Sequence, residues 1–255
     1  MTPNHVKRRL RAGQPAFGTL LHLADPLAAE MMASVGFEWL LVDTEHGPID
    51  LATLAAMFAT ITRYPVAPLV RVHALAEENV KRVLDAGAWG VLAPNVRTAE
   101  EAERLVAACK YPPAGGRSLG AGRFPLSFRT DAQTYFARAN DEILVIVQIE
   151  HVEAVKNIDA ILGVPGVDAC YVGPNDWCAS AGLAPSLEPS HREFEEAMHV
   201  VLAAARRHRV AAGIHCQAAE TVNRRIREGF TLVGMVNDHR FLMAGATAAR
   251  DAVKT

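Results

Sequence analysis

The chain repeats one pattern of hydrophobic and polar positions along its length. A short run of apolar or β-branched residues is followed by a polar turn, and then by a segment whose apolar positions recur with helical spacing. Runs of this kind are typical of buried β-strands. They predict strands at Ala16–Leu20, Trp39–Val42, Ala67–Val70, Gly90–Ala93, Ile143–Ile149, Ala169–Val172, Ala211–Ile214 and Leu232–Val236.

Segments with helical spacing lie between these strands. They predict helices over residues 26–35, 50–62, 76–86, 99–109, 152–162, 190–208, 217–228 and 239–252. Strands that alternate with helices run parallel, and eight such units close more naturally into a barrel than into an open sheet. We therefore expect an α/β fold, a (β/α)8 TIM barrel, formed by residues 1–255 as a single domain.

One long interval interrupts this rhythm between the fourth and fifth strands. Residues 111–142 exceed what one connecting helix requires, and long loops in compact domains are usually functional or disordered. Residues 131–140 predict a short helix, which leaves 112–130 as a flexible loop. Its glycine-rich part, residues 114–122, matches neither a Walker loop nor a dinucleotide-binding fingerprint.

Charge and cysteine content narrow the possible partners. The chain has 26 basic and 28 acidic residues and lacks the basic excess of a nucleic-acid-binding protein. Its four cysteines are far apart, which indicates reduced, packed thiols rather than a disulfide framework or a zinc ribbon. No export signal or membrane span is visible. We expect a cytoplasmic protein without nucleic-acid or membrane partners.

The polar residues that follow the strands carry the candidate chemistry, because active sites of parallel barrels lie at the carboxyl ends of the strands. Glu150 and Asp176 follow neighbouring strands. Two carboxylates without a histidine or cysteine cluster suit an oxygen-preferring ion such as Mg²⁺ or Mn²⁺. The alternative is structural: one carboxylate caps the following helix and the other forms a salt bridge.

His46 lies in the loop after the second strand and is the candidate acid or base. Either Asp43 or Asp85 could orient its imidazole, and the sequence leaves this choice open. Arg71 ends the third strand and could bind a substrate carboxylate or an enolate oxygen. An ion pair with Asp43 or Glu45 is an equally good interpretation of Arg71.

The five lysines of the chain all lie away from the predicted carboxyl ends of the strands. A Schiff-base mechanism needs a desolvated lysine at the barrel mouth. If this barrel performs carbanion chemistry on a keto acid, a metal must therefore act as the electron sink. The turn Gly173-Pro174-Asn175-Asp176 precedes a helical segment and could present backbone N–H groups to an anion.

The same residues form separated motifs in a specific order. These are Gly36-Phe37-Glu38-Trp39-Leu40-Leu41-Val42-Asp43-Thr44-Glu45-His46-Gly47-Pro48, Leu69-Val70-Arg71-Val72, Tyr111-Pro112-Pro113-Ala114-Gly115-Gly116-Arg117, Gln148-Ile149-Glu150 and Gly173-Pro174-Asn175-Asp176. With them, residues 15–250 resemble the HpcH/HpaI aldolase family of metal-dependent class II pyruvate aldolases.

The resemblance implies a barrel of the phosphoenolpyruvate/pyruvate type and a homohexamer of dimers that exchange a C-terminal helix. It implies that Glu150 and Asp176 hold Mg²⁺, Mn²⁺ or Co²⁺, which pyruvate chelates, and that Arg71 stabilises the enolate. His46, paired with Asp85, would be the acid/base. Gln148 would order the site, and backbone groups of Gly173, Pro174 and Asn175 would hold the substrate carboxylate.

The implied reaction is reversible cleavage of a 4-hydroxy-2-oxo acid or a 2-keto-3-deoxy sugar acid to pyruvate and an aldehyde. One alternative is a citrate-lyase-like or malyl-thioester lyase, and another is a non-catalytic barrel that binds a keto acid.

Several positions depart from the family pattern. Thr44 replaces a common glycine, and Trp177-Cys178 replaces Leu-Ser. The strand ends Gly213-Ile214-His215-Cys216 and Val236-Asn237-Asp238-His239 are also unusual. These positions touch the barrel mouth, so they bear on aldehyde specificity and leave the metal ligands intact.

Overall fold

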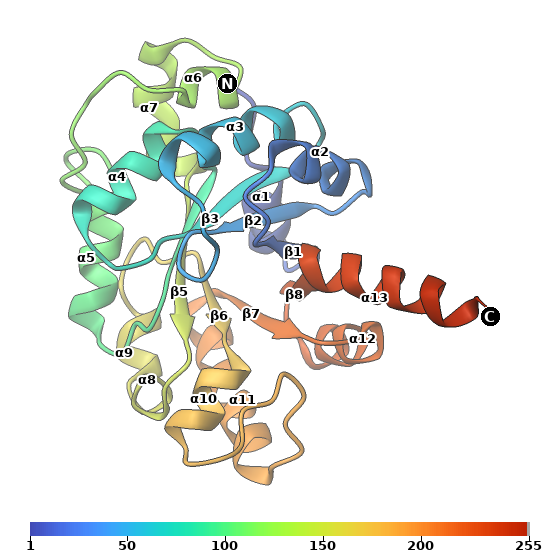
Figure 1. The fold of residues 1–255 in the computed structure, drawn as a ribbon. Coiled ribbons are helices and arrows are strands. Elements are labelled where there is room, and N and C mark those ends of the chain that lie inside the picture. The colour runs from blue at the N-terminus through green and yellow to red at the C-terminus, as the bar shows by residue number, and fades with distance from the viewer. Residues whose placement is uncertain (254–255) are drawn as a thin grey trace.

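A computed structural model describes residues 1–253 of the chain. Parallel strands close into a barrel in sequence order, and helices surround it (Figure 1). The strands are β1 (Ala16–Leu21), β2 (Trp39–Asp43), β3 (Ala67–Arg71), β4 (Gly90–Ala93), β5 (Leu144–Ile149), β6 (Ala169–Val172), β7 (Ala211–Cys216) and β8 (Leu232–Asn237). All eight predicted strands are confirmed, and the fold is a TIM barrel.

The helices agree with the predicted pattern and add shorter pieces. They are α1 (His5–Arg11), α2 (Pro26–Ser34), α3 (Leu51–Ile61), α4 (Glu77–Asp85), α5 (Ala99–Cys109), α6 (Phe124–Ser127), α7 (Ala132–Glu142), α8 (Val152–Lys156), α9 (Ile158–Leu162), α10 (Pro174–Ser180), α11 (Arg192–His208), α12 (Ala219–Glu228) and α13 (Asp238–Ala252). Helices α1 and α6 were not predicted, and α10 begins at Pro174, inside the turn that was expected to precede a helical segment. The helix predicted over 152–162 is divided at Asn157, whose amide donates to the Arg97 carbonyl at 2.9 Å.

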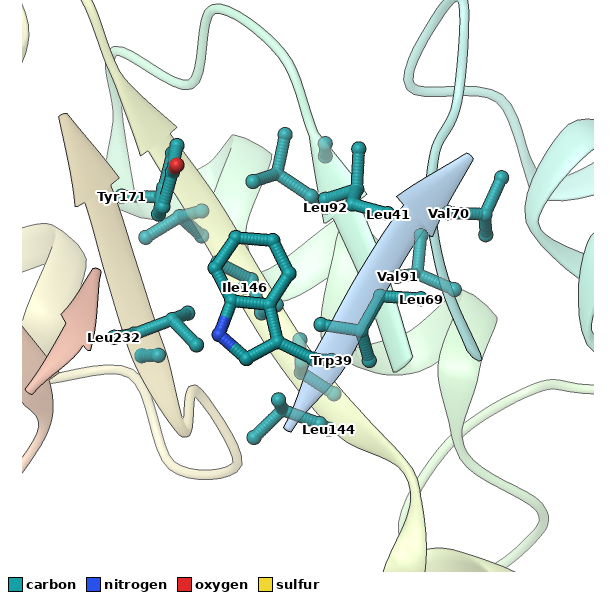
Figure 2. Packing of buried hydrophobic residues seen from close by; sticks show 14 of the residues in the cluster. Trp39, Leu41, Leu69, Val70, Val91, Leu92, Leu144, Ile146, Tyr171 and Leu232 are labelled. Atoms are coloured by element: carbon teal, nitrogen blue, oxygen red, sulfur yellow. The ribbon is translucent and has the colours of Figure 1, made fainter. Parts of the chain in front are cut away.

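Large side chains fill the interior of the barrel. The Trp39 indole lies among Leu144, Leu232 and Tyr171 (Figure 2), and the Trp39 and Tyr171 rings meet edge to face at 6.2 Å. A Cβ on Gly18 would collide with the indole, so this position has to be glycine. The interior of the barrel is therefore a packed core and not a channel.

A β-bulge in β8 shapes the carboxyl end of the barrel. Gly18 pairs with Gly234 but Leu20 pairs with Asn237, so β8 contains one more residue than β1 over this stretch. Val236 has a φ of 39°, a left-handed conformation that is rare for a β-branched residue. The Thr19 hydroxyl donates to the Met235 carbonyl at 2.8 Å. Bulges re-aim the side chains that follow them, and Asn237 is the first to follow this one.

The segment 112–130 is anchored to the barrel rather than free. Arg117 is fully buried, and its guanidinium donates to Asp85 at 2.8 Å and to the Tyr135 hydroxyl at 3.1 Å. The same guanidinium lies 4.6 Å from the centre of the Tyr111 ring. The expectation of a flexible loop overlooked this anchor, because a single arginine gives no periodic signal. Within residues 1–253, no helix is long and apolar enough to cross a membrane.

Candidate active site

Two adjoining cavities lie at the carboxyl ends of the strands. One has a volume of about 320 Å³ and is lined by the predicted residues His46, Arg71, Gln148, Gly173, Pro174, Asn175 and Asp176. The other has a volume of about 280 Å³ and is lined by Glu45, His46, Asn95, Arg97, Glu150, His151 and Asp176. His46 and Asp176 line both cavities. The chain thus brings most of the predicted site residues to one place.

Asp43 ends β2 and is the electrostatic centre of this region. Its fully buried carboxylate accepts from Arg71 Nε at 2.9 Å and Nη2 at 2.6 Å. His22 Nε2 lies 2.8 Å from Oδ2, at an angle that is poor for a hydrogen bond. Burial alone would raise the pKa of Asp43, but the contacts from His22 and Arg71 hold it well below its usual range.

The contacts of Asp43 bear on two questions that the sequence left open: which carboxylate orients His46, and whether Arg71 forms an ion pair. Within this chain, Asp43 contacts the side chains of His22 and Arg71, and it reaches His46 only through the backbone N–H, at 3.4 Å. The Arg71 ion pair that the sequence offered as an alternative is therefore present. It does not remove Arg71 from the site, because Arg71 lines the larger cavity and its Nη1 lies 3.5 Å from Gln148 Oε1.

Glu150 is held in place by neutral donors. The Asn95 N–H donates to Oε1 at 2.7 Å, and Gln148 Nε2 donates to Oε2. Asn95 has a φ of 54°, a conformation that asparagine tolerates better than most residues. A Cβ on Gly173 would lie 2.9 Å from Glu150 Oε2, so glycine is needed for this close approach. Glu150 does not cap the following helix, where His151 takes that position.

The acidic groups of the smaller cavity suit a divalent cation. Burial, and then the negative charge of Asp176, raise the pKa of Glu150 to about 7. Glu45 Oε2 is buried without a hydrogen-bond donor, 3.2 Å from Arg71 Nε, and burial also raises the pKa of Glu45. Carboxylates that lie close enough to repel one another favour a hard cation between them. Within residues 1–253, no three His, Cys, Asp or Glu side chains converge as ligands, so water and substrate would complete the coordination.

His46 is accessible from both cavities. Its side chain is 62% exposed, and its Nε2 lies 3.9 Å from Glu45 Oε2, its nearest carboxylate contact. An exposed imidazole beside a cavity can exchange protons with both solvent and substrate. Among the described residues, Glu45 rather than Asp43 is therefore the carboxylate that contacts the His46 imidazole.

Asp85 is not part of this group in the isolated chain. It ends α4, its carboxylate accepts from Arg117, and it lines neither cavity. The pairing of His46 with Asp85 that the resemblance implies is not formed within this chain.

Other polar residues of the larger cavity come from β1, β6, β7 and β8. Tyr171 was missed by the sequence reasoning, because it lies inside an apolar strand whose outward-facing and inward-facing positions look alike. Three histidines also line this cavity, namely His22, His215 and His239. Each of them ends or follows a strand, and this position is the sequence signal that identifies them. None of the lysines in the described part of the chain, residues 1–253, lines either cavity.

Comparisons with known proteins place this site in a family context. Residues 17–243 match the model of the HpcH/HpaI aldolase/citrate lyase family. A hydroxypyruvate/pyruvate aldolase of Pseudomonas aeruginosa is 38% identical over 94% of this chain and 89% of its own length. A 4-hydroxy-2-oxo-heptane-1,7-dioate aldolase of Salmonella heidelberg (strain SL476) is 37% identical over 96% of this chain and 92% of its own length.

A solved structure shows the same architecture throughout. An HpcH/HpaI aldolase/citrate lyase family protein from Burkholderia cenocepacia J2315 is 33% identical, covers 99% of this chain and 100% of its own, and superposes with a TM-score of 0.92. The chain therefore belongs to the HpcH/HpaI aldolase/citrate lyase family and is an aldolase, a carbon–carbon lyase.

Proposed function

We propose that this aldolase reversibly cleaves a 4-hydroxy-2-oxo acid, or a 2-keto-3-deoxy sugar acid, to pyruvate and an aldehyde, with a divalent metal ion bound by Glu150 and Asp176. The observation that carries the proposal is the meeting of these carboxylates with Arg71 and His46 around adjoining cavities. When bound, Mg²⁺, Mn²⁺ or Co²⁺ would supply the Lewis acid that polarises the keto group of the substrate.

The protein groups would bind and orient the keto-acid half. The N–H groups of Asn175 and Asp176, in the first turn of α10, have no helical acceptor and can bind the substrate carboxylate beside Gly173 and Pro174. Arg71 adds positive charge where the oxygen of the keto group gains negative charge during cleavage. Because Asp43 holds the guanidinium at two nitrogens, Arg71 meets the substrate already oriented.

The proton steps belong to His46. In the cleavage direction the His46 imidazole accepts the proton of the C4 hydroxyl. The C3–C4 bond then breaks, and the electron pair of that bond moves into the keto-acid half. Protonation at C3 then gives pyruvate. A positioned base of this kind typically contributes about 10²–10⁴-fold to the rate. Gln148 fixes Glu150 and approaches Arg71, so it connects the two sides of the site.

Exchange of the methyl protons of pyruvate in D₂O tests this proposal without knowledge of the aldehyde. Chelator-treated protein should exchange slowly by NMR, and restoring Mg²⁺ or Mn²⁺ should accelerate the exchange. The absence of exchange with every divalent ion would contradict the proposal. Cleavage of malyl-CoA in preference to 4-hydroxy-2-oxo acids would favour a thioester lyase instead.

Replacing His46 by alanine tests the proton step separately. The His46→Ala variant should bind the metal and pyruvate but lose aldol cleavage by about 10²-fold or more. His199→Ala is the matched control, since His199 lies exposed on α11, away from both cavities. Unchanged turnover of His46→Ala would exclude this role of His46.

A further inference from the structure

The wall of the larger cavity formed by β1, β6, β7 and β8 is unusually polar for the interior of a barrel. His22, Tyr171, His215, Asn237 and Arg240 all line it. Of the two proposed metal ligands, Glu150 directly follows β5 and Asp176 lies in α10, which follows β6. This wall is therefore free to meet the half of the substrate that departs as the aldehyde.

Tyr171 and His215 form a hydrogen-bonded pair in this wall. The Tyr171 hydroxyl lies 3.1 Å from His215 Nδ1, and it has no other hydrogen-bond partner among the described residues. A Cβ on Gly234 would collide with this hydroxyl and would lie 3.3 Å from Nδ1, so Gly234 provides the space for the pair. Figure 2 shows the Tyr171 ring rising from the strand beyond Trp39.

The direction of this hydrogen bond follows from the protonation of its partners. Burial, and then the positive charge of Arg71, lower the pKa of His215 to about 3, so the imidazole is neutral. Burial raises the pKa of Tyr171 well above its usual value, so the phenol keeps its proton. Because the phenol proton needs an acceptor, Tyr171 donates to Nδ1. The imidazole proton then lies on Nε2.

His215 therefore offers a fixed neutral donor to the cavity. Its Nε2 has no hydrogen-bond partner within residues 1–253, and it is not among the atoms shielded from solvent. A neutral N–H in this position suits a hydroxyl or carbonyl oxygen. It offers nothing to an alkyl group, which would leave the N–H unsatisfied.

Arg240 adds a positive charge to the same wall. It is exposed in the first turn of α13, and it forms no ion pair with the described part of the chain. His22 and His239 lie beside each other, with ring centres 5.3 Å apart, and both line the same cavity. An arginine that faces a cavity without an acidic partner is a natural site for a carboxylate or phosphate.

We propose that this wall selects an aldehyde that carries a hydroxyl group and an anionic end, with His215 binding the hydroxyl, Tyr171 positioning His215, and Arg240 binding the anion. This inference rests on the proposed aldolase function and adds the chemical class of the aldehyde. Recognition of a hydroxyl by a positioned donor gives stronger discrimination than an apolar contact of the same size, because a wrong substrate that displaces water from the cavity leaves the donor unpaired.

Competing aldehydes of equal carbon number test the hydroxyl contact. Aldol addition of pyruvate to glyceraldehyde and to propanal is compared as the ratio of their kcat/KM values. The natural protein should prefer glyceraldehyde, and His215→Leu should reduce this ratio by about tenfold. His199→Leu, an exposed substitution on α11, is the matched control. An unchanged ratio in His215→Leu would overturn the assignment.

Tyr171→Phe tests the positioning role with a spectroscopic signal. In the natural protein the ¹⁵N shifts of His215 should report a neutral ring protonated at Nε2. Tyr171→Phe should produce a mixture of tautomers and a smaller decrease in the aldehyde ratio than His215→Leu. A ring protonated at Nδ1 in the natural protein would overturn the proposed direction of the hydrogen bond.

Charged aldehydes test the anion contact and distinguish its two sources. Succinic semialdehyde is compared with butanal, and glyceraldehyde 3-phosphate with glyceraldehyde. Within each pair the preference is the ratio of the kcat/KM values of the charged and the uncharged aldehyde. Arg240→Gln should reduce this ratio by about tenfold or more in the carboxylate pair, in the phosphate pair or in both. Arg227→Gln on α12 is the matched control. Unchanged preferences in both pairs would refute the anion site. If the natural protein does not exchange the methyl protons of pyruvate with any divalent ion, the aldolase proposal itself is refuted instead.

Discussion

At the scale of single residues, Asp43 shows how one buried carboxylate supports several functional groups. It forms an ion pair with Arg71, lies 2.8 Å from His22 Nε2 and accepts from two backbone N–H groups of the following loop. Asp43→Asn should destabilise the protein by about 3 kcal/mol, because Arg71 stays buried and keeps only Glu45, at 3.2 Å, as a close counter-charge. Urea unfolding measures this loss. Asp131→Asn is the control, since asparagine can also cap α7.

The same substitution should also reduce pyruvate exchange, because the Arg71 guanidinium loses the partner that orients it. We expect a decrease of about 10²-fold, comparable to the loss of other positioned electrostatic groups. A stable Asp43→Asn variant with full exchange activity would show that Arg71 needs no such support.

Gly173 tests how closely the site around Glu150 is packed. In Gly173→Ala the new methyl group would lie 2.9 Å from Glu150 Oε2 and 3.0 Å from Gln148 Nε2, so both side chains have to move. We expect about tenfold weaker Mn²⁺ binding with little loss of fold. Calorimetric titration measures the affinity. Gly116→Ala is the control, because nothing lies within 4 Å of its Cβ position. Equal affinities in the two variants would contradict this prediction.

The buried thiols predict a pH dependence of stability. Burial raises the pKa of Cys109, Cys170 and Cys216 to about 12. In the unfolded chain a thiol ionises near pH 8.5, so the folded state binds more protons between these values. The stabilisation is complete below about pH 8.5 and is lost as the pH rises towards 12. Urea unfolding between pH 7.5 and 10.5 should show the decline.

Cys170→Ala separates this effect from groups such as Lys7, whose pKa burial lowers to about 8. The variant should be less stable at neutral pH and should lose less stability as the pH rises. Parallel pH curves for the variant and the natural protein would show that the Cys170 thiol does not contribute.

At the scale of elements, the segment between α5 and α7 depends on the ion pair of Arg117 with Asp85. Arg117 is fully buried, whereas the Asp85 side chain is 24% exposed. Asp85→Asn should therefore lower the free energy of unfolding more than Arg117→Met does. Asp85→Asn leaves the buried Arg117 charge without its partner, whereas in Arg117→Met the partly exposed Asp85 can still be hydrated. Urea unfolding of both single variants and the double variant should show strong non-additivity.

Activity of the same variants tests the pairing of Asp85 with His46. If Asp85 acts only through Arg117, the Asp85→Asn and Arg117→Met variants should show the same dependence of aldol cleavage on pH. If Asp85 assists His46 in the assembled protein, only Asp85→Asn should change the profile.

The elements also show what the sequence can and cannot predict. Strands were predictable because apolar runs such as Trp39–Val42 differ sharply from the polar turns that follow them. The start of α10 was not predictable, because the helix is short and already begins within the Gly-Pro turn that was expected to precede it. The bulge in β8 was hidden as well, because the extra residue, near Val236, is apolar like its neighbours. Pairing of distant side chains, such as Tyr171 with His215, has no local signal at all.

At the scale of the whole molecule, α13 extends away from the barrel (Figure 1). The only buried residue on this helix is Asp238, while Leu242 and Met243 are each 61% exposed. Exposed apolar side chains that gather on one projecting helix are typical of an interface. We propose that a second copy of the chain covers them in a homo-oligomer, for which the family resemblance implies a hexamer.

Charged substitutions on α13 test this assembly. The double variant Leu242→Glu, Met243→Glu should lower the mass measured by light scattering at micromolar concentration, because burying two carboxylates in an apolar interface is unfavourable. Val200→Glu on α11 is the control, since Val200 is 45% exposed on another helix. Because Arg240 belongs to the same helix, separation of the subunits should also weaken the preference for anionic aldehydes. A natural protein of monomeric mass would contradict the proposal, and so would a variant that keeps the assembled mass.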